Sequence, residues 1–495
     1  MRRRRSTQCR CFSVNSLIAE QPFRVLNFCG NLEMLGVLVM SLVLISPLPL
    51  LPLLLIAAVA VRVLKVFRSA KTVAFFHPHA AGRGGGERVL WAAVDALINR
   101  SDISKVVIYS IDTNREAILS AKNATFNFKT SPSQSKIEFK RVYFSSLLEA
   151  GFWPIAAIFG QSIGSVLVLI SALLTSTSWP DIFVDTTGCP FTLPAAKLLT
   201  GAKTSAYIHY PTMSRDMLAK VINKETDFNN KLVYAKSGWL QQLKLLYYKI
   251  FLFLYRCCGW FADVAVGNSR WTVSRICDVW HRNDVQVLYP PAAIGDGTRI
   301  SALPKETREN AILSLAQFRP EKNHKLQLTV FARVLQKAPE TMFWMMGGAR
   351  NESDLQLVED LKQFAFKDLR IPEERIEFII NAPWSEISDR LRRAKCAIHT
   401  MKDEHFGISL LEFLEAKIPV VAHRSGGPEM DILLPDEQFG FLATSESEFA
   451  TKVLHVLKSF DQLADRRIEA YNSLSRFLSD QRFGAEFSKI LVYFL

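Results

Sequence analysis

A chain of 495 residues, 49% hydrophobic and 22% charged, is too long for one ordinary hydrophobic core and too apolar to be disordered. Its formal net charge of +13 predicts anionic partners, which include phosphates, anionic lipid head groups and nucleic acid. No recognised nucleic-acid motif is present and much of the positive charge flanks apolar segments, so nucleic acid is not expected as a partner.

The first apolar segment runs from Met34 to Val61, 28 residues without a charge, where about 20 span a bilayer as a helix. It is longer than the apolar part of a secretory signal, so we expect residues 1–70 to be retained as a tail and membrane segment. Basic residues flank both ends, so the positive-inside rule gives no orientation. Pro47, Pro49 and Pro52 interrupt the segment, which leaves a re-entrant hairpin with both ends cytosolic as an alternative to one tilted span.

Beyond residue 71, short β-branched or aromatic runs alternate with longer stretches that can hold a helix, which is typical of parallel sheets covered by helices. The first series of runs lies at residues 72–77, 106–110, 181–187, 204–210 and 264–269. The second series lies at residues 311–318, 341–348, 375–380, 396–401 and 419–423. A proline-rich segment, residues 287–310, separates the two series. The sequence therefore predicts an α/β chain with two tandem Rossmann-like domains, residues 71–300 and 301–495.

Two stretches of the first predicted domain are suited to contact with a membrane. Residues 151–178 carry no charge, and residues 239–260 begin and end in tryptophan. In the second stretch Lys244, Lys249 and Arg256 stand among large apolar side chains, an arrangement that lets a helix lie in a membrane interface. The alternatives are a buried helix for either stretch and a membrane span for the first.

The stretch EHFGISLLE, residues 404–412, follows a predicted strand and opens a predicted helix that ends before Pro419. Gly407 and Ile408 are then expected at the helix N-terminus, where free N–H groups favour an anion such as a diphosphate. Glu412 lies about one turn into the helix and leans back toward that end, while Glu404 lies in the preceding loop. The two carboxylates would bracket a phosphate site and accept hydrogen bonds from sugar hydroxyls, although an isolated pair with this spacing is more often two solvated charges.

Two more stretches of the second domain point to the same ligand. Arg319 and Lys322 follow its first strand and provide cations for a diphosphate, and Gly426 and Gly427 form a tight turn after another strand. Ligands of parallel sheets bind at the carboxyl ends of the strands. The second domain is therefore predicted to bind a nucleotide diphosphate.

In the first domain the stretch HPHAAGRGGGERVLW, residues 77–91, also joins a strand to a helix. It departs from the dinucleotide pattern G-x-G-x-x-G, so an oxidoreductase is poorly supported. Gly84, Gly85 and Gly86 are predicted to cradle a phosphate of the acceptor. His209 follows another strand and is expected to face the interdomain cleft, with a purely structural histidine as the alternative.

Several motifs together resemble a known family. GNSRWT (267–272), LYPP (288–291), FRPEK and the paired glutamates followed by SGGP resemble the retaining nucleotide-sugar glycosyltransferases of family 4, with the GT-B fold. The longer motifs FFHPHAAGRGGGERVLW, AYIHYPTMSRDML and SLAQFRPEKNH are similar to those of the endoplasmic-reticulum α-1,2-mannosyltransferases of asparagine-linked glycosylation. These enzymes add the fourth and fifth mannoses to the dolichol-linked oligosaccharide.

The resemblance implies specific roles at matching positions. Glu404 would contact the mannose of GDP-mannose and His209 would line the catalytic cleft. Donor binding would fall to Arg319, Lys322, Gly407, Ile408 and Glu412, with Glu412 on the ribose and Gly426 and Gly427 in a turn near the donor. Acceptor binding would fall to Gly84, Gly85 and Gly86.

Three positions depart from the family pattern. Gln317 stands where many members have a glycine followed directly by the arginine, so the role of Arg319 is less sure than that of Lys322. Arg83 interrupts the glycine run, and Lys417 stands where a small residue is expected.

The expected reaction needs the leaving diphosphate stabilised, which cations and helix-terminal N–H groups provide. No D-x-D motif is present, so no metal or other cofactor is expected, and the departing phosphate would take the proton of the acceptor hydroxyl. The expected partners are GDP-mannose, the dolichyl-pyrophosphate oligosaccharide and endoplasmic-reticulum membrane lipids, with the catalytic domains on the cytosolic face. The alternatives are another lipid-linked glycosyltransferase with a different donor or acceptor, and a non-catalytic membrane scaffold.

Overall fold

The computed structural model describes residues 71–82, 84–126, 132–176, 179–213, 222, 238–291, 308–433, 438–475 and 480–492. The predicted membrane segment at 34–61, Arg83 and most of the predicted linker lie outside these ranges. The described residues all belong to one compact unit, Phe67–Leu495.

The first sheet has seven parallel strands in the order β3-β2-β1-β4-β5-β6-β7. Its strands are β1 (Lys71–Phe76), β2 (Ile103–Ser110), β3 (Ile137–Arg141), β4 (Ile182–Asp185), β5 (Lys203–Ile208), β6 (Val264–Gly267) and β7 (Gln286–Val287). All five strands predicted for this part of the chain are present. The two that the sequence did not predict, β3 and β7, lie at the edges of the sheet.

The second sheet has six parallel strands in the order β10-β9-β8-β11-β12-β13. Its strands are β8 (Glu309–Leu315), β9 (Met342–Gly347), β10 (Ile376–Ile380), β11 (Ala394–His399), β12 (Val420–His423) and β13 (Phe441–Ala443). All five predicted strands are present, and only the short edge strand β13 was not predicted. The prediction of two tandem Rossmann-like domains is confirmed.

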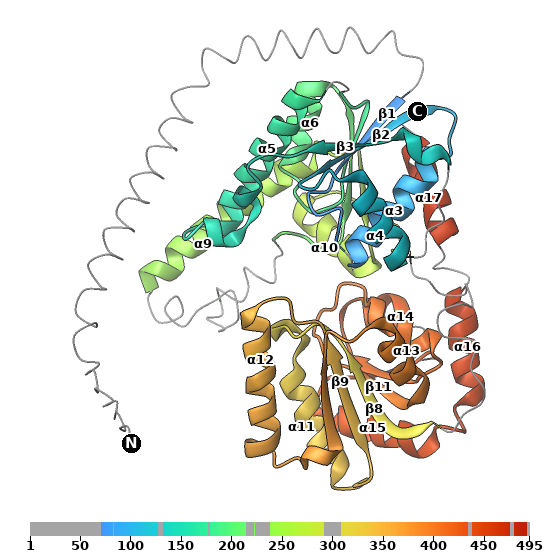
Figure 1. Ribbon diagram of the computed structural model, residues 1–495. Helices are drawn as coiled ribbons and strands as arrows, with labels where there is room; N and C mark the ends of the chain where they lie inside the picture. Colours follow the sequence, from blue (N-terminus) through green and yellow to red (C-terminus); the bar gives the residue numbers. More distant parts are fainter. Residues whose placement is uncertain are drawn as a thin grey trace, which may run out of the picture. The chain divides into compact units, whose positions relative to one another are not determined.

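Helices cover both faces of each sheet (Figure 1). Those of the first part are α3 (Gly85–Ile98), α4 (Arg115–Phe126), α5 (Ala157–Thr175), α6 (Thr192–Thr200), α9 (Gly238–Gly259) and α10 (Arg270–Trp280). The helices that follow β8 in the chain are α11 (His324–Leu335), α12 (Glu352–Gln363), α13 (Trp384–Arg393), α14 (Ile408–Glu415), α15 (Glu446–Ser459), α16 (Ala464–Ser475) and α17 (Asp480–Val492).

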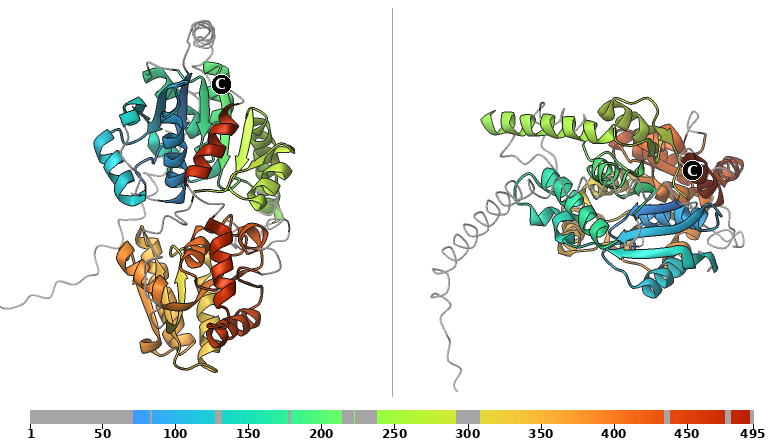
Figure 2. Two further views of the ribbon diagram at one scale, coloured as in Figure 1. Left: turned by 90° about the vertical axis from the view of Figure 1, so that its right-hand side faces the viewer. Right: turned by 90° about the horizontal axis from the view of Figure 1, so that it is seen from above.

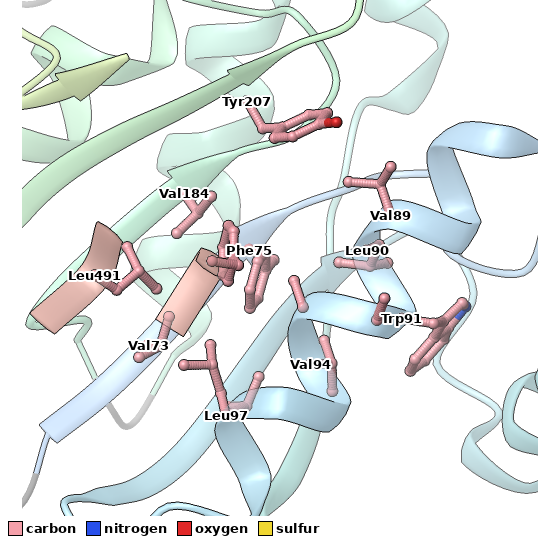
Figure 3. Close-up of a cluster of buried hydrophobic side chains, with 14 of the residues drawn as sticks. Val73, Phe75, Val89, Leu90, Trp91, Val94, Leu97, Val184, Tyr207 and Leu491 are labelled. Atoms are coloured by element: carbon pink, nitrogen blue, oxygen red, sulfur yellow. The ribbon is translucent and has the colours of Figure 1, made fainter. Parts of the chain in front are cut away.

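The first sheet is buried on both faces because its strands are apolar at successive positions. In β1, Val73 and Phe75 pack into the core beneath α3, while Ala74 and Phe76 pack into the core on the opposite face. Figure 3 shows Phe75 among side chains of α3 and beside Leu491. Such continuous apolar runs are what a sheet covered on both faces requires.

The helix α17 packs against the first sheet although it follows the second sheet in sequence (Figures 1 and 2). Phe487 stacks on Phe75 with ring centroids 6.2 Å apart, and Arg88 of α3 donates three hydrogen bonds of 3.0, 3.1 and 3.3 Å to Asp480. The domain boundary near residue 300 stays a prediction. The helix α17 follows this boundary in the chain but contributes to the core of the first sheet, which precedes it.

Among the described helices, α5 is the one long and apolar enough to cross a membrane, with a mean hydropathy of 2.0. One of its faces is part of the protein core, because Val168, Leu169 and Ala172 are fully buried with the first sheet. Contact of residues 151–178 with a membrane therefore stays a prediction.

Candidate active site

Several of the predicted site residues lie where the strand order of each sheet reverses, while His209 follows β5 and the turn at Gly426 and Gly427 follows β12. In the first sheet this point is between β1 and β4, and in the second it is between β8 and β11. Loops that leave neighbouring parallel strands in opposite directions open a crevice at the carboxyl ends of those strands. The glycine turn, which contains Gly82, Gly84, Gly85 and Gly86, follows β1. Lys322 follows β8 and Glu404 follows β11.

Glu404 and Lys322 form an ion pair in which Glu404 is buried and Lys322 is partly buried. The Nζ of Lys322 donates a 2.6 Å hydrogen bond to Oε2 of Glu404, and the ring of His399 is 3.0 Å from the same oxygen. Burial opposes ionisation of Glu404, but the hydrogen bond with His399 and the charge of Lys322 outweigh it and hold the pKa of this carboxyl well below its usual range. Glu404 is therefore a carboxylate that accepts hydrogen bonds.

The helix α14 begins as the sequence predicted. Gly407 is its N-cap, with a φ of 108° in the left-handed region, and Ile408 is its first residue. Glu412 lies one turn further along and is partly buried. The N–H groups at the start of α14 thus follow directly on the loop that holds Glu404, which suits an anion beside that carboxylate.

The turn at Gly426 and Gly427 packs on the backbone of the Glu404 loop. The N–H of Gly427 donates a 2.7 Å hydrogen bond to the carbonyl of Glu404, and Ser425 accepts a 2.7 Å hydrogen bond from the N–H of Asp403. A Cβ on Gly426 would lie 2.2 Å from the Glu404 carbonyl oxygen. The turn therefore holds the backbone of the loop that carries the Glu404 side chain.

On the side of the first sheet, the glycine turn meets both His209 and α14. A Cβ on Gly85 would lie 2.5 Å from Cδ1 of Ile408, and a Cβ on Gly86 would lie 3.6 Å from Nε2 of His209. Gly84 is the N-cap of α3. The predicted acceptor glycines thus lie beside His209 and beside Ile408, the first residue of α14.

His209 is a neutral imidazole with one free ring nitrogen. Burial lowers its pKa to about 4, with His77 as a further cause, against opposing effects of Glu87 and a hydrogen bond with the backbone of Thr186. Its Nε2 is buried without a hydrogen-bond partner, so the hydrogen bond with the backbone of Thr186 is donated by Nδ1–H to the Thr186 carbonyl. The Nε2 lone pair is then an acceptor for a hydroxyl group.

Comparisons with known proteins agree with this geometry. The family model described as "ALG11 mannosyltransferase N-terminus" matches residues 70–280, and "Glycosyl transferases group 1" matches residues 298–473. The chain is 39% identical to the GDP-Man:Man(3)GlcNAc(2)-PP-Dol alpha-1,2-mannosyltransferase of Xenopus laevis, over 85% of this chain and 87% of that one. It is 36% identical to the Homo sapiens enzyme of the same name, over 85% of this chain and 86% of that one.

The chain belongs to the GDP-Man:Man(3)GlcNAc(2)-PP-Dol alpha-1,2-mannosyltransferase family.

Solved structures place this mannosyltransferase-family chain in the GT-B fold. The sucrose-phosphate synthase of Thermosynechococcus elongatus matches with a TM-score of 0.60 at 12% identity, over 86% of this chain and 98% of that one. Anabaena Alr3699/HepE in complex with UDP matches with a TM-score of 0.59 at 15% identity, over 86% of this chain and 100% of that one. At these identities the likeness concerns the fold.

Arg319, which was predicted to bind the donor together with Lys322, forms no ion pair with Glu404 in the mannosyltransferase-family chain. The side chain of Arg319 is 39% exposed and lies 3.9 Å from Glu321. Its contribution to donor binding stays a prediction. Lys322, unlike Arg319, has two partners in this site, because its Nζ contacts the sulfur of Met401 at 3.1 Å as well as Glu404.

Sequence reasoning missed two histidines of the mannosyltransferase site. His399 ends the strand β11 and bonds Glu404, and His405 stacks on Tyr210 with ring centroids 3.9 Å apart. The hydroxyl of Ser269 donates a 2.6 Å hydrogen bond to the carbonyl of His405. The signal available in the sequence was position, since both histidines flank Glu404 closely. The partner of His399 is Glu404 itself, whereas Tyr210 and Ser269, the partners of His405, lie far away in the sequence.

Replacing Gly426 with alanine is expected to destabilise the turn behind Glu404. Gly426 has a φ of 66°, which costs a residue with a side chain about 1–2 kcal/mol, and its Cβ would collide with the backbone of Glu404. We expect a lower melting temperature and a weaker shift of that temperature on addition of GDP. Alanine at Gly151, where a Cβ would meet no atom within 4 Å, is the matched control. Equal melting curves for both variants and the unmodified chain would contradict the role of the turn.

Proposed function

We propose that this chain transfers mannose from GDP-mannose to Man(3)GlcNAc(2)-PP-dolichol in α-1,2 linkage, with retention of configuration, to add the fourth and fifth mannoses. The observation that carries the proposal is the ionised Glu404 paired with Lys322 directly before the N-terminus of α14. Membership in the mannosyltransferase family supports the same donor and acceptor.

On the donor side, the diphosphate of GDP-mannose is assigned to the N–H groups of Gly407 and Ile408 and to Lys322. Partial positive charge at a helix N-terminus and a lysine ammonium both stabilise the negative charge that develops on the leaving diphosphate. Glu404 would accept hydrogen bonds from mannose hydroxyls, and Glu412 would bind the ribose. The 2.6 Å contact between Lys322 and Glu404 supports this assignment, because the cation lies against the carboxylate that is assigned to the sugar.

On the acceptor side, His209 and the glycine turn are assigned to the reacting mannose and its lipid-linked oligosaccharide. The free Nε2 of His209 can accept a hydrogen bond from the attacking hydroxyl and so orient it. The departing phosphate takes the proton of that hydroxyl as the new bond forms on the face that the diphosphate leaves. No side-chain nucleophile is needed for this step.

The direct test incubates the full chain in detergent with GDP-mannose and Man(3)GlcNAc(2)-PP-dolichol, and measures the mass of the released glycan. A gain of two hexoses, sensitive to an α-1,2-mannosidase, is the expected result. UDP-glucose, UDP-N-acetylglucosamine and acceptors one mannose shorter serve as the comparison panel. Transfer from another nucleotide sugar, or to another acceptor only, would contradict the proposal and favour a different lipid-linked glycosyltransferase.

We further propose that α9 lies in the interface of the endoplasmic-reticulum membrane, with the catalytic domains on the cytosolic face. Figures 1 and 2 show α9 extending beyond the edge of the first sheet. Large apolar side chains at alternating spacings of four and three residues are at least half exposed along it, and they share one helix face. They are Trp239, Leu243, Leu246, Ile250 and Phe253, and Trp260 follows the helix. The nearby Lys249 and Arg256 suit anionic lipid head groups.

The membrane contact of α9 is tested by tryptophan fluorescence of the full chain in vesicles that contain brominated lipids. Bromine quenches tryptophans that enter the acyl region, so we expect quenching that falls when Trp239 and Trp260 are replaced by phenylalanine. The Trp384→Phe variant is the matched control, because Trp384 is also exposed but lies on α13 beside the second sheet. Undiminished quenching in the Trp239→Phe, Trp260→Phe variant would contradict the proposal.

A further inference from the structure

Glu87 is a partly buried carboxylate that the reaction described above does not use. It lies in the first turn of α3, and its Oε2 accepts a 2.8 Å hydrogen bond from the N–H of Gly84. A Cβ on Gly82 would lie 2.6 Å from one carboxylate oxygen of Glu87, and a Cβ on Gly84 would lie 2.7 Å from the other. The glycine turn thus encloses the carboxylate. A side chain at Gly82 or Gly84 would collide with it, which explains why glycine stands at both positions.

The same carboxylate faces His77 at the end of β1. The distance between Oε1 of Glu87 and Nε2 of His77 is 3.9 Å, within the range of an ion pair. Burial opposes ionisation of Glu87, but its interaction with His77 and the hydrogen bonds from the backbone outweigh this effect, so the pKa of Glu87 is lowered. Glu87 therefore presents a negative charge to both the turn and His77.

His77 links Glu87 to the residue that holds His209. Its Nδ1 is 2.8 Å from the hydroxyl oxygen of Thr186, and both side chains are almost completely buried. The backbone of Thr186 in turn bonds the ring of His209. A continuous set of contacts thus leads from the glycine turn through Glu87, His77 and Thr186 to His209.

We propose that Glu87 is a positioning residue that fixes the glycine turn and, through His77 and Thr186, orients the free Nε2 of His209 toward the acceptor hydroxyl. This inference rests on the proposed function, because it assigns the acceptor hydroxyl to His209. Without the Glu87 carboxylate, His77 loses the partner of its Nε2, and the ring of His209 loses a fixed direction relative to Gly86. The donor residues Glu404 and Lys322 lie after strands of the other sheet and are expected to keep their arrangement.

The test is a double-mutant cycle with Glu87→Gln and His77→Asn. Glutamine keeps an oxygen for the Gly84 N–H but removes the charge, and asparagine keeps a polar group near Thr186 but removes Nε2. We expect each single variant to lower kcat by about tenfold while the KM for GDP-mannose changes by less than about twofold. The double variant is expected to be no slower than the slower single variant, because both changes break the same set of contacts.

The Glu116→Gln variant is the matched control, since Glu116 also lies in the first turn of a helix, α4, and is exposed. Multiplicative losses in the double variant, unchanged kcat in Glu87→Gln, or a loss confined to the KM for GDP-mannose would overturn the inference. If Glu87→Gln fails to fold, His77→Asn alone decides, because it leaves the Glu87 contact with Gly84 intact. If the unmodified chain transfers no mannose, the proposed function fails, and non-additive shifts in melting temperature over the same cycle then decide whether Glu87 and His77 are coupled.

Discussion

Replacement of Glu404 by glutamine is expected to lower mannosyl transfer by about a thousandfold while the chain stays folded. Glutamine has nearly the same shape, but it lacks the negative charge that Lys322 and His399 stabilise at Oε2. An amide nitrogen facing either partner is repelled, so the side chain can no longer hold the mannose hydroxyls in the geometry of transfer. The measurement is the rate of hexose addition under saturating donor and acceptor, with circular dichroism as the check on folding.

The matched control for Glu404→Gln is Glu321→Gln, the same chemical change next to Lys322 on a side chain that is 47% exposed. It is expected to leave the rate within about twofold of the unmodified chain, as surface substitutions do. A Glu404→Gln chain that keeps full activity would remove Glu404 from the mechanism and return the paired glutamates to ordinary loop and helix positions.

Replacement of Lys322 by methionine is expected to lower kcat by about a hundredfold or more and to weaken binding of GDP. Methionine keeps the length and apolar stem of lysine but carries no charge for the leaving diphosphate. It also leaves the buried carboxylate of Glu404 with His399 and the His405 N–H as its remaining partners. GDP affinity, measured by calorimetry, separates the loss of the phosphate contact from any change in the rate of the chemical step.

The control for this prediction is Lys325→Met, because Lys325 is exposed on the first turn of α11 and follows Lys322 closely in sequence. Its variant is expected to bind GDP normally. Equal affinity for GDP in all three chains would mean that the diphosphate is held without Lys322, and would leave the N–H groups of α14 and Arg319 as the candidates.

The parts of the fold that could be predicted are those determined by the residues of one short stretch of the chain. The ten predicted strands are apolar runs that a sheet covered on both faces needs, and the start of α14 is marked by Gly407 and its end by Pro419. The edge strand β3 escaped prediction because its residues Ile137–Arg141 alternate with charges, and β7 and β13 are too short to form a recognisable run.

The site could be predicted only in part, for a related reason. Polar and charged residues after strands made Glu404, Lys322 and His209 the predicted site residues, since the carboxyl ends of parallel strands meet at one edge of a sheet. The contacts of Glu404 with His399 and of Glu87 with His77 join residues five and ten positions apart, but they depend on how the chain turns after strands β11 and β1. No local pattern encodes them, so a buried histidine beside a carboxylate reads in the sequence as an ordinary core residue.

The packing of α17 on the first sheet has a consequence for how the chain is made. Phe75 emerges from the ribosome early, but its stacking partner Phe487 and the buried Leu491 belong to a helix that begins at Asp480. The first sheet therefore cannot close this core until all six strands of the second sheet, the last of which ends at Ala443, have been synthesised. The second sheet is complete in sequence before that point, so it can fold earlier. Until then an apolar surface on the nascent chain stays open, and it is available to chaperones during translation.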